Sequence, residues 1–251
     1  KRTIILAAGG SGGHVFPAQA LAESLIERGW TVFFVTDQRG ERYANEFPKE
    51  VKKLVLNMSN PRGDAKFRLM RAFWSLSLSF IIILRFCLKV KATTIVGFGG
   101  YPSATSIAVA QILRVPSVLH EQNAILGRVN SIFQKRVNLL VFGITPKSKV
   151  NRKGPTLLLG NPIRQSVLAV MPVDYSQLPS ESLSIMVMGG SQGANFVSSL
   201  ACNAIVELPE EMRRKITVKI ETVCEASANI GTRLLPPHFS GHSVAIDDFR
   251  V

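Results

Sequence analysis

The same short sequence motif occurs twice in this chain, and it constrains the fold more than any other feature. An apolar run at residues 3–8 leads into a GGSGG turn at 9–13, and a second run at 184–188 leads into a GGSQG turn at 189–193. A buried strand that feeds a glycine turn at a helix N-terminus is a common phosphate site, because exposed N–H groups and the helix dipole favour an anion. Two such copies predict that the chain has two halves, each with the α/β fold of a nucleotide-binding domain.

The rest of the sequence alternates short β-branched runs with longer helical stretches, which is typical of βαβ units in an α/β fold. A hydrophobic content of 46% fits a parallel sheet that is buried on both faces. A segment with two prolines, 171–184, is interpreted as a linker or its flank. The pattern predicts strands at 3–8, 31–35, 54–57, 94–97, 117–120, 139–142, 156–159 and 184–188, and helices at 16–28, 69–90, 103–113 and 194–208.

Glycines and polar residues follow the ends of several predicted strands. They are His14, Gly99-Gly100, the run 120–123 and Arg164. Ligands of open α/β sheets bind at the carboxyl ends of the strands. We therefore expect these residues to share one edge of the sheet, although turn formation also explains each loop taken singly.

The charge balance indicates an anionic partner. Lys and Arg total 30 against 17 Asp and Glu, a formal net charge of +13, which fits a membrane surface or a phosphorylated substrate. A generally basic surface is the alternative. No nucleic-acid-binding motif is present, so no nucleic-acid partner is expected. The three cysteines form no CxxC pair, so neither a zinc site nor a disulfide framework is expected.

The segment 73–84 (FWSLSLSFIIIL) is uncharged and apolar on nearly every face when it is placed on a helix. It is too short to predict a transmembrane helix. One interpretation is a buried core helix. The other is a surface patch that dips into a bilayer, with Trp74, Phe80 and Ile82 on the membrane face. In that case anionic headgroups would meet the flanking cations Lys66, Arg68, Arg71, Arg85, Lys89 and Lys91.

The first glycine turn only partly matches a dinucleotide fingerprint. The third glycine of G-x-G-x-x-G is absent, although Asp37 follows the second strand and could hold a ribose. His14 lies directly on the turn, where a cofactor cradle needs no imidazole. An imidazole at that depth could act as a base near neutral pH, or it could cap or pack at the helix start.

Five motifs in this order and spacing resemble glycosyltransferase family 28, the bacterial peptidoglycan glycosyltransferases that add N-acetylglucosamine (GlcNAc) to lipid I. The resemblance covers roughly residues 1–210. The motifs are GGSGGHVFP at 9–17, GFGGYPS at 97–103, HEQN at 120–123, GNPIR at 160–164 and GGSQGA at 189–194.

The resemblance implies a GT-B-like fold of two Rossmann-like domains, an N-terminal acceptor and membrane domain at 1–164 and a partial donor domain at 165–251. It implies inverting transfer of GlcNAc from UDP-GlcNAc to the 4-hydroxyl of lipid I. His14 matches the proposed general base, and Glu121 is a second catalytic candidate. Gly99, Gly100 and Tyr101 match the loop for the acceptor diphosphate, and the apolar segment matches the membrane patch. The donor-binding positions are Ser11, Gly12, Gly13, Asn123, Arg164 and Ser191.

The same resemblance implies UDP-GlcNAc and lipid I as substrates, an anionic membrane surface and cell-wall synthesis proteins as partners, and a peripheral location on the cytoplasmic face of the inner membrane. No cofactor and no metal is expected, since no DxD-type pair occurs in the motifs. The family's later donor-site motifs are not found, so the second domain is expected to be incomplete and transfer impaired. Two alternatives stay open: an NAD-dependent oxidoreductase and a non-catalytic membrane- or diphosphate-binding remnant.

Overall fold

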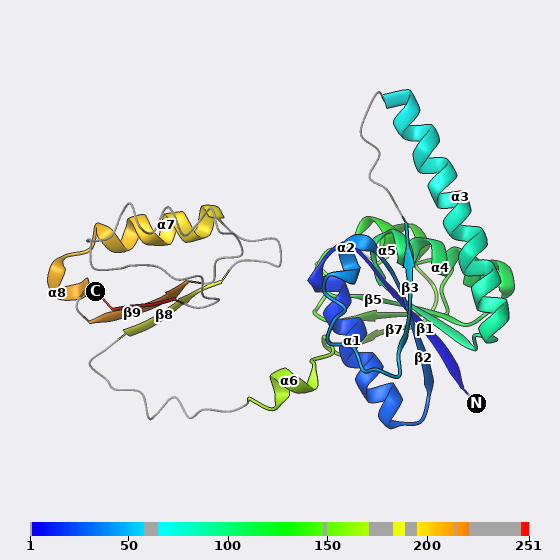
Figure 1. Cartoon of the computed structure of the whole chain (residues 1–251), viewed down its shortest axis with the longest axis horizontal. Coiled ribbons are helices and arrows are strands. Elements are labelled where there is room, and N and C mark those ends of the chain that lie inside the picture. Colours follow the sequence, from blue (N-terminus) through cyan, green and yellow to red (C-terminus); the bar gives the residue numbers. More distant parts are fainter. Residues whose placement is uncertain are drawn as a thin grey trace. The chain divides into compact units, whose positions relative to one another are not determined.

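The computed structural model describes residues 2–57, 65–147, 150–170, 183–188, 195–213, 215–220 and 247–250. The chain divides into two compact units, Lys1–Met171 and Pro172–Val251, and each is described by itself (Figure 1).

The first unit is built around a seven-stranded sheet in which every described strand pair runs parallel. The strand order is β3-β2-β1-β4-β5-β6-β7. The strands are β1 (Thr3–Ala8), β2 (Thr31–Asp37), β3 (Lys52–Leu56), β4 (Thr94–Gly99), β5 (Ser117–Glu121), β6 (Leu139–Phe142) and β7 (Thr156–Leu158). The helices are α1 (Gly12–Glu27), α2 (Gln38–Glu41), α3 (Ala65–Val90), α4 (Gly100–Leu113), α5 (Arg128–Phe133) and α6 (Gln165–Leu168).

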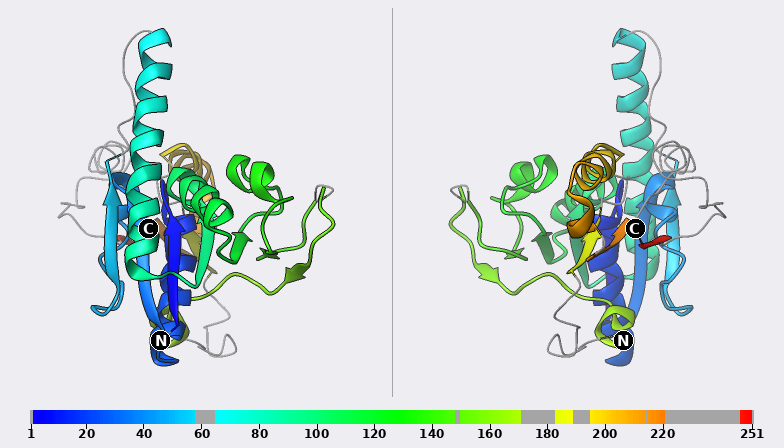
Figure 2. Two further views of the ribbon diagram at one scale, coloured as in Figure 1. Left: turned by 90° about the vertical axis from the view of Figure 1, so that its right-hand side faces the viewer. Right: turned by 90° about the vertical axis from the view of Figure 1, so that its left-hand side faces the viewer.

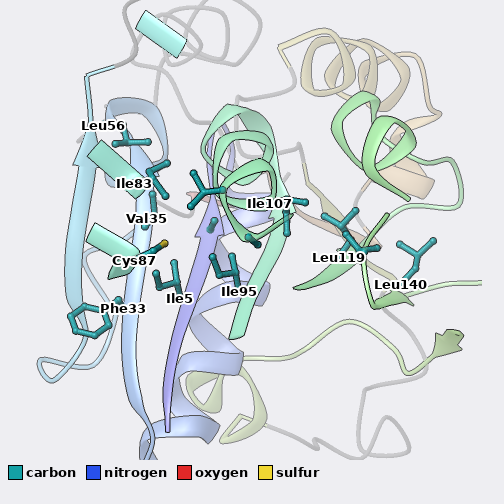
Figure 3. Close-up of a cluster of buried hydrophobic side chains, with 14 of the residues drawn as sticks. Ile5, Phe33, Val35, Leu56, Ile83, Cys87, Ile95, Ile107, Leu119 and Leu140 are labelled. Carbon is teal, nitrogen blue, oxygen red and sulfur yellow. The ribbon is translucent and has the colours of Figure 1, made fainter. Parts of the chain in front are cut away.

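Helices cover both faces of this sheet, which explains why its central strands are apolar throughout. Successive side chains of a strand point to opposite faces. Ile4 and Leu6 of β1 therefore pack with α1, while Ile5 packs in a second cluster with Ile83 of α3 and Ile107 of α4 (Figure 3). All six residues of β1 are buried. The expected buried parallel sheet is confirmed.

Helices α1 and α4 begin earlier than the sequence pattern predicts, and this changes where the site residues lie. Helix α1 starts at Gly12 rather than at residue 16, and α4 starts at Gly100 rather than at 103. Glycine has a low helix propensity, so a propensity argument interprets these residues as loop. In the fold, Gly12, Gly13 and His14 form the first turn of α1. The N–H of His14 donates to the carbonyl of Ser11 at 3.1 Å, whereas the N–H groups of Gly12 and Gly13 have no partner within the helix.

The second unit has a smaller sheet in the order β10-β9-β8. Its elements are β8 (Leu183–Val187), α7 (Asn195–Val206), α8 (Glu210–Arg213), β9 (Ile216–Ile220) and β10 (Asp247–Arg250). Strands β8 and β9 are parallel, as in a βαβ unit, and β10 pairs antiparallel with β9. Ile216 and Val218 of β9 form its buried cluster with side chains of β8 and α7.

Candidate active site

The carboxyl ends of the parallel strands bring four of the sequence motifs to one edge of the first sheet. Strands β1, β4 and β5 are neighbours in this sheet. They end at Ala8, Gly99 and Glu121, so their following loops start side by side. The GNPIR loop follows β7 and returns to the β5 loop through hydrogen bonds described below. The expectation of a shared edge is confirmed for the motifs of the first unit.

His14 is oriented by a single backbone contact. Its Nδ1 lies 2.9 Å from the carbonyl oxygen of Gly9. Because a carbonyl only accepts, Nδ1 carries the proton and donates it there. The other ring nitrogen, Nε2, is left with its lone pair. A Cβ placed on Gly99 would lie 2.8 Å from that Nε2, so the free nitrogen lies against the Gly99-Gly100 turn.

The two glycine turns pack directly on each other. The N–H of Gly9 donates to the carbonyl of Gly99 at 3.2 Å. A Cβ on Gly100 would lie 2.7 Å from the Gly9 carbonyl oxygen, and Gly99 and Gly100 have φ values of +118° and +80°. Only glycine fits this contact and backbone without strain. Tyr101, the next residue, is exposed.

The start of α1 offers backbone donors beside His14. Ser11 is the N-cap, and its side chain makes no capping hydrogen bond. The N–H groups of the first turn and the positive end of the helix dipole favour an anion here. Ser11, Gly12 and Gly13, which the family resemblance implies as donor-binding positions, therefore lie together at the start of α1.

Asp37 is committed to holding this turn in place. Its Oδ1 accepts from the N–H of Gly10 at 3.1 Å and from the N–H of Gly40 at 2.8 Å. Arg39 lies 3.5 Å from the other carboxylate oxygen, and Asp37 is buried. A ribose-binding Asp would need accessible oxygens, so the interpretation of Asp37 as a nicotinamide ribose ligand loses its physical basis.

Glu121 is buried, and both of its oxygens are occupied. Oε1 accepts from the backbone N–H of Asn123 at 3.1 Å and from its side-chain amide at 3.3 Å. Oε2 accepts from the N–H of Gly127 at 2.8 Å and from Nδ2 of Asn130 at 2.9 Å. The carboxylate therefore shapes the loop between β5 and α5 and fixes the exposed Asn123 upon it.

His120 ties the β5 loop to the GNPIR loop. Its Nε2 lies 3.3 Å from the Gly160 carbonyl, and its Nδ1 accepts from the side-chain amide of Gln122 at 3.1 Å. Nδ2 of Asn161 donates to the Gln122 carbonyl at 3.3 Å. Burial lowers the pKa of His120 below 6.5. The imidazole of His120 is thus neutral and links the two loops. Its proton is on Nε2, whereas the proton of His14 is on Nδ1.

Arg164 is positioned by residues that sequence reasoning missed. Its Nη1 lies 2.7 Å from Oε2 of Glu46, and its guanidinium lies 4.2 Å from the ring centroid of Phe16. The following N–H, of Gln165, donates to Glu23 at 2.9 Å. Glu46 and Glu23 lie more than a hundred residues earlier in the chain, and no local pattern links them to the GNPIR motif.

The second glycine turn, including Ser191, lies outside the described residues. Among the residues that are described, no group of three or more His, Cys, Asp or Glu side chains could hold a metal ion.

Helix α3 has one buried and one exposed face over its described side chains. Trp74 is 69% exposed, and Leu78, Ile81, Ile82 and Leu88 are exposed on the same side. Ile83 and Cys87 are buried. Figures 1 and 2 show the first turns of α3 extending beyond the other elements of the first unit. In the parts of the chain that are described, no helix is long and apolar enough to cross a membrane.

The prediction for Phe80 is corrected by this arrangement. Phe80 is partly buried against the core cluster instead of sharing the exposed face of Trp74 and Ile82. At roughly 100° per residue, Phe80 lies about 120° around the helix from Trp74 and nearly opposite Ile82. The alternation of serines and apolar residues hid this period in the sequence.

The first unit defines a class: an α/β protein with glycine-rich turns at the carboxyl edge of a parallel sheet. Solved structures agree with the GT-B-like fold. The crystal structure of Acinetobacter baumannii MurG matches with a TM-score of 0.63 and 22% identity, over 83% of this chain and 58% of that chain. A putative UDP-N-acetylglucosamine 2-epimerase from Listeria monocytogenes matches with a TM-score of 0.57 and 10% identity, over 95% of this chain and 67% of that one.

Residues 4–140 match the glycosyltransferase family 28 N-terminal domain, and the chain belongs to this family. Curated relatives carry the name UDP-N-acetylglucosamine--N-acetylmuramyl-(pentapeptide) pyrophosphoryl-undecaprenol N-acetylglucosamine transferase. The Agrobacterium fabrum protein is 40% identical, over 87% of this chain and 58% of its own length. The Rhizobium etli protein is 37% identical, over 94% of this chain and 66% of its own length. The chain thus spans about three fifths of these relatives, and no comparison supports the oxidoreductase alternative.

Proposed function

We propose that the chain serves inverting transfer of GlcNAc from UDP-GlcNAc to the 4-hydroxyl of lipid I. The observation that carries this proposal is the free Nε2 of His14, held against the Gly99-Gly100 turn and beside the N-terminus of α1. A base, a candidate diphosphate turn and an anion-binding helix start thereby meet at one sheet edge. The names of the curated relatives supply the substrates.

In this proposal His14 takes the proton of the acceptor hydroxyl as its oxygen attacks the anomeric carbon of GlcNAc. The bond between that carbon and the diphosphate breaks on the opposite face, so configuration inverts and UDP leaves. The negative charge that develops on UDP is stabilised by the start of α1, by Arg164 and by Asn123. Ser191 is expected to add a donor contact from the second unit.

Glu121 has a positioning role in this proposal rather than a proton-transfer role. Its four hydrogen bonds leave no open coordination at the carboxylate oxygens. Neutralising it by protonation would weaken all four. Its contribution is to hold Asn123 where the donor would lie.

We further propose peripheral binding to the cytoplasmic face of the inner membrane through the exposed face of α3. Trp74 and Ile82 supply apolar area, and Arg85 and Lys89 on the same face supply charge for anionic headgroups. Lipid I is itself membrane-bound, so this attachment would bring its diphosphate to the Gly99-Gly100 turn. Cell-wall synthesis proteins are expected partners at the same membrane.

A chimaera tests the proposed transfer. Residues 1–171 of this chain would be joined to the C-terminal part of the Agrobacterium fabrum relative and assayed with radiolabelled UDP-GlcNAc and a lipid I analogue. We expect labelled product, and none from the relative's C-terminal part alone. A chimaera that folds and binds UDP-GlcNAc but transfers no sugar would refute the proposed role of the first unit.

Two matched variants test the membrane face. Trp74→Ser should reduce binding to anionic vesicles at least severalfold and leave thermal stability nearly unchanged, because Trp74 is exposed. Phe80→Ser should instead cost about 1–3 kcal/mol of unfolding free energy, since it removes a ring packed on the core. Vesicle co-sedimentation and denaturant unfolding measure the two effects. Equal vesicle binding by the parent and Trp74→Ser would contradict the assignment.

A further inference from the structure

Positive charge is concentrated in one part of the chain, and the proposed reaction does not use all of it. Residues 65–173 contain 15 Lys and Arg but a single acidic residue, Glu121. Both oxygens of that carboxylate are already occupied by N–H donors. Arg152 donates instead to the backbone carbonyls of Gly154, Val137 and Asn138. Cations of this stretch with neither a carboxylate nor such a carbonyl are left to water or an external anion.

Two of these cations line a cavity at the opposite edge of the sheet from the candidate active site. The cavity has a volume of about 410 Å³ and is lined by Gln111 and Arg114 near the end of α4, by Ser117 at the start of β5, and by Arg136 and Asn138 just before β6. We call it the far-edge cavity. The two ion pairs described in the first unit, Arg39–Asp37 and Arg164–Glu46, involve neither of its arginines.

The side-chain amides of the far-edge cavity, on Gln111 and Asn138, also have N–H groups to donate. Nε2 of Gln111 is buried and has no hydrogen-bond partner among the described residues. Oδ1 of Asn138 accepts from the N–H of Ser117 at 2.8 Å and from its hydroxyl at 3.4 Å. Asn138 therefore has only its amide N–H groups left to offer. Arg114, Arg136 and Asn138 are exposed, so Nε2 of Gln111 is the lining donor that is buried without a partner among the described residues. Together these donors favour a ligand rich in acceptor oxygens.

The backbone conformation of Arg114 also favours a binding role for its side chain, because an arginine stands where glycine is the usual residue. Arg114 ends α4 in the left-handed region, with φ +54° and ψ +31°. Glycine fills such a C-terminal position without strain and is the common residue there. The negative end of the α4 dipole opposes an anion, but the N–H groups of Arg114 and Val115 already bond its last carbonyls, and two full positive charges outweigh the partial one.

We propose that the far-edge cavity binds a phosphate group. Two guanidinium groups can each grip a pair of phosphate oxygens, which is the geometry that Arg matches best. The amide donors of Gln111 and Asn138 would take further oxygens. The phosphate could belong to a soluble compound or to a lipid headgroup, and the two sources give different results below. This site is separate from the His14 edge and does not depend on the proposed transfer.

Titration of the 251-residue chain with inorganic pyrophosphate tests the proposal, with binding followed at backbone amide resonances. We expect shifts at Arg114, Ser117 and Asn138 that saturate independently of any shifts at residues 9–14. Vesicles of phosphatidylglycerol and of phosphatidylcholine form a second arm. Shifts with pyrophosphate assign a soluble source, and shifts only with phosphatidylglycerol vesicles assign a headgroup. Shifts with neither, or shifts confined to residues 9–14 and 99–100, would overturn the proposal.

Matched variants separate the cavity from general charge. Arg114→Gly removes a guanidinium while it relaxes the backbone, so lost binding cannot be ascribed to misfolding. Together with Arg136→Gln it should weaken binding at the cavity at least tenfold. Lys135→Gln removes the same charge one residue away, outside the cavity lining, and should change binding less than twofold. Equal losses for Lys135→Gln and Arg136→Gln would show unspecific attraction and refute a built site.

Discussion

The turn after β1 and the end of β5 lie at the same edge of the sheet but differ in their hydrogen bonding. Both β1 and β5 are parallel strands of the buried sheet, and each of the two regions carries a titratable residue that the family resemblance marks as catalytic. His14 makes one hydrogen bond and keeps a free nitrogen, whereas Glu121 accepts four and keeps nothing free. A place at the carboxyl edge is therefore not enough to transfer a proton, because the group also needs an unoccupied lone pair.

The largest effect is expected at His14. In the chimaera, His14→Ala should lower turnover by about 10²–10⁴-fold, as for the loss of a general base, which corresponds to roughly 2.7–5.5 kcal/mol of activation free energy. Affinity for UDP-GlcNAc should change little. Unfolding free energy should fall by at most about 1.5 kcal/mol, since one hydrogen bond is lost. Steady-state kinetics and denaturant unfolding measure these quantities, and unchanged turnover would return His14 to a packing role.

Glu121 should behave in the opposite way. Glu121→Ala would leave several buried donors unpaired, so unfolding free energy should fall by about 2–4 kcal/mol. Glu121→Gln keeps the shape of the side chain and one acceptor oxygen. Its unfolding free energy should therefore lie between those of the parent and of Glu121→Ala. Any lost turnover should follow the loss of folded protein or of donor affinity. A stable Glu121→Gln chimaera with normal UDP-GlcNAc binding and a turnover lower by about 10³-fold would show a direct catalytic role for the carboxylate. The proposed difference between His14 and Glu121 would then be wrong.

Gly99 tests whether the free nitrogen must lie where it does. Gly99→Ala places a Cβ within 2.8 Å of His14 Nε2 at a φ of +118°. The imidazole must move, and the backbone strain should cost about 1–3 kcal/mol of stability. Turnover should fall more than UDP-GlcNAc affinity in the chimaera. An alanine variant with parental kinetics would show that the contact between His14 and this turn is dispensable.

The smallest effect concerns His120, which links the β5 loop to the GNPIR loop. Burial lowers the pKa of its imidazole below the ordinary 6.5, so below pH 6.5 the unfolded chain takes up a proton that the folded chain does not. Stability from the neutral ring is complete above pH 6.5 and is lost as the pH falls toward the folded pKa, by up to about 1.4 kcal/mol per pH unit. Unfolding curves of the parent and of His120→Gln should converge as the pH falls over this interval. His14→Ala should keep the parental pH dependence, and a variant curve parallel to the parent's would contradict the role of His120.

The two regions also show why the sequence predicts strands better than site contacts. Strands β1 and β6 were predicted at their observed bounds, since an apolar run covered on both faces is a local signal. The start of α1 was missed because Gly12 and Gly13 oppose helix formation locally. Their placement in the helix depends on the surrounding fold, where Asp37 binds the N–H of Gly10.

The sequence by itself determined the parallel sheet, the edge at which polar residues gather and the family, because periodic burial and ordered motifs are written along the chain. Only the tertiary structure decided which catalytic candidate, His14 or Glu121, keeps an unoccupied lone pair. The ion-pair partner of Arg164 lies 118 residues away. The donors that occupy Glu121 are near in sequence, but the path of the loop to α5 that brings them to the carboxylate is left open by the sequence. Phe80 was likewise placed by packing of α3 on the core. Hydrogen bonding and packing at such distances depend on the folded backbone, and no local pattern encodes them.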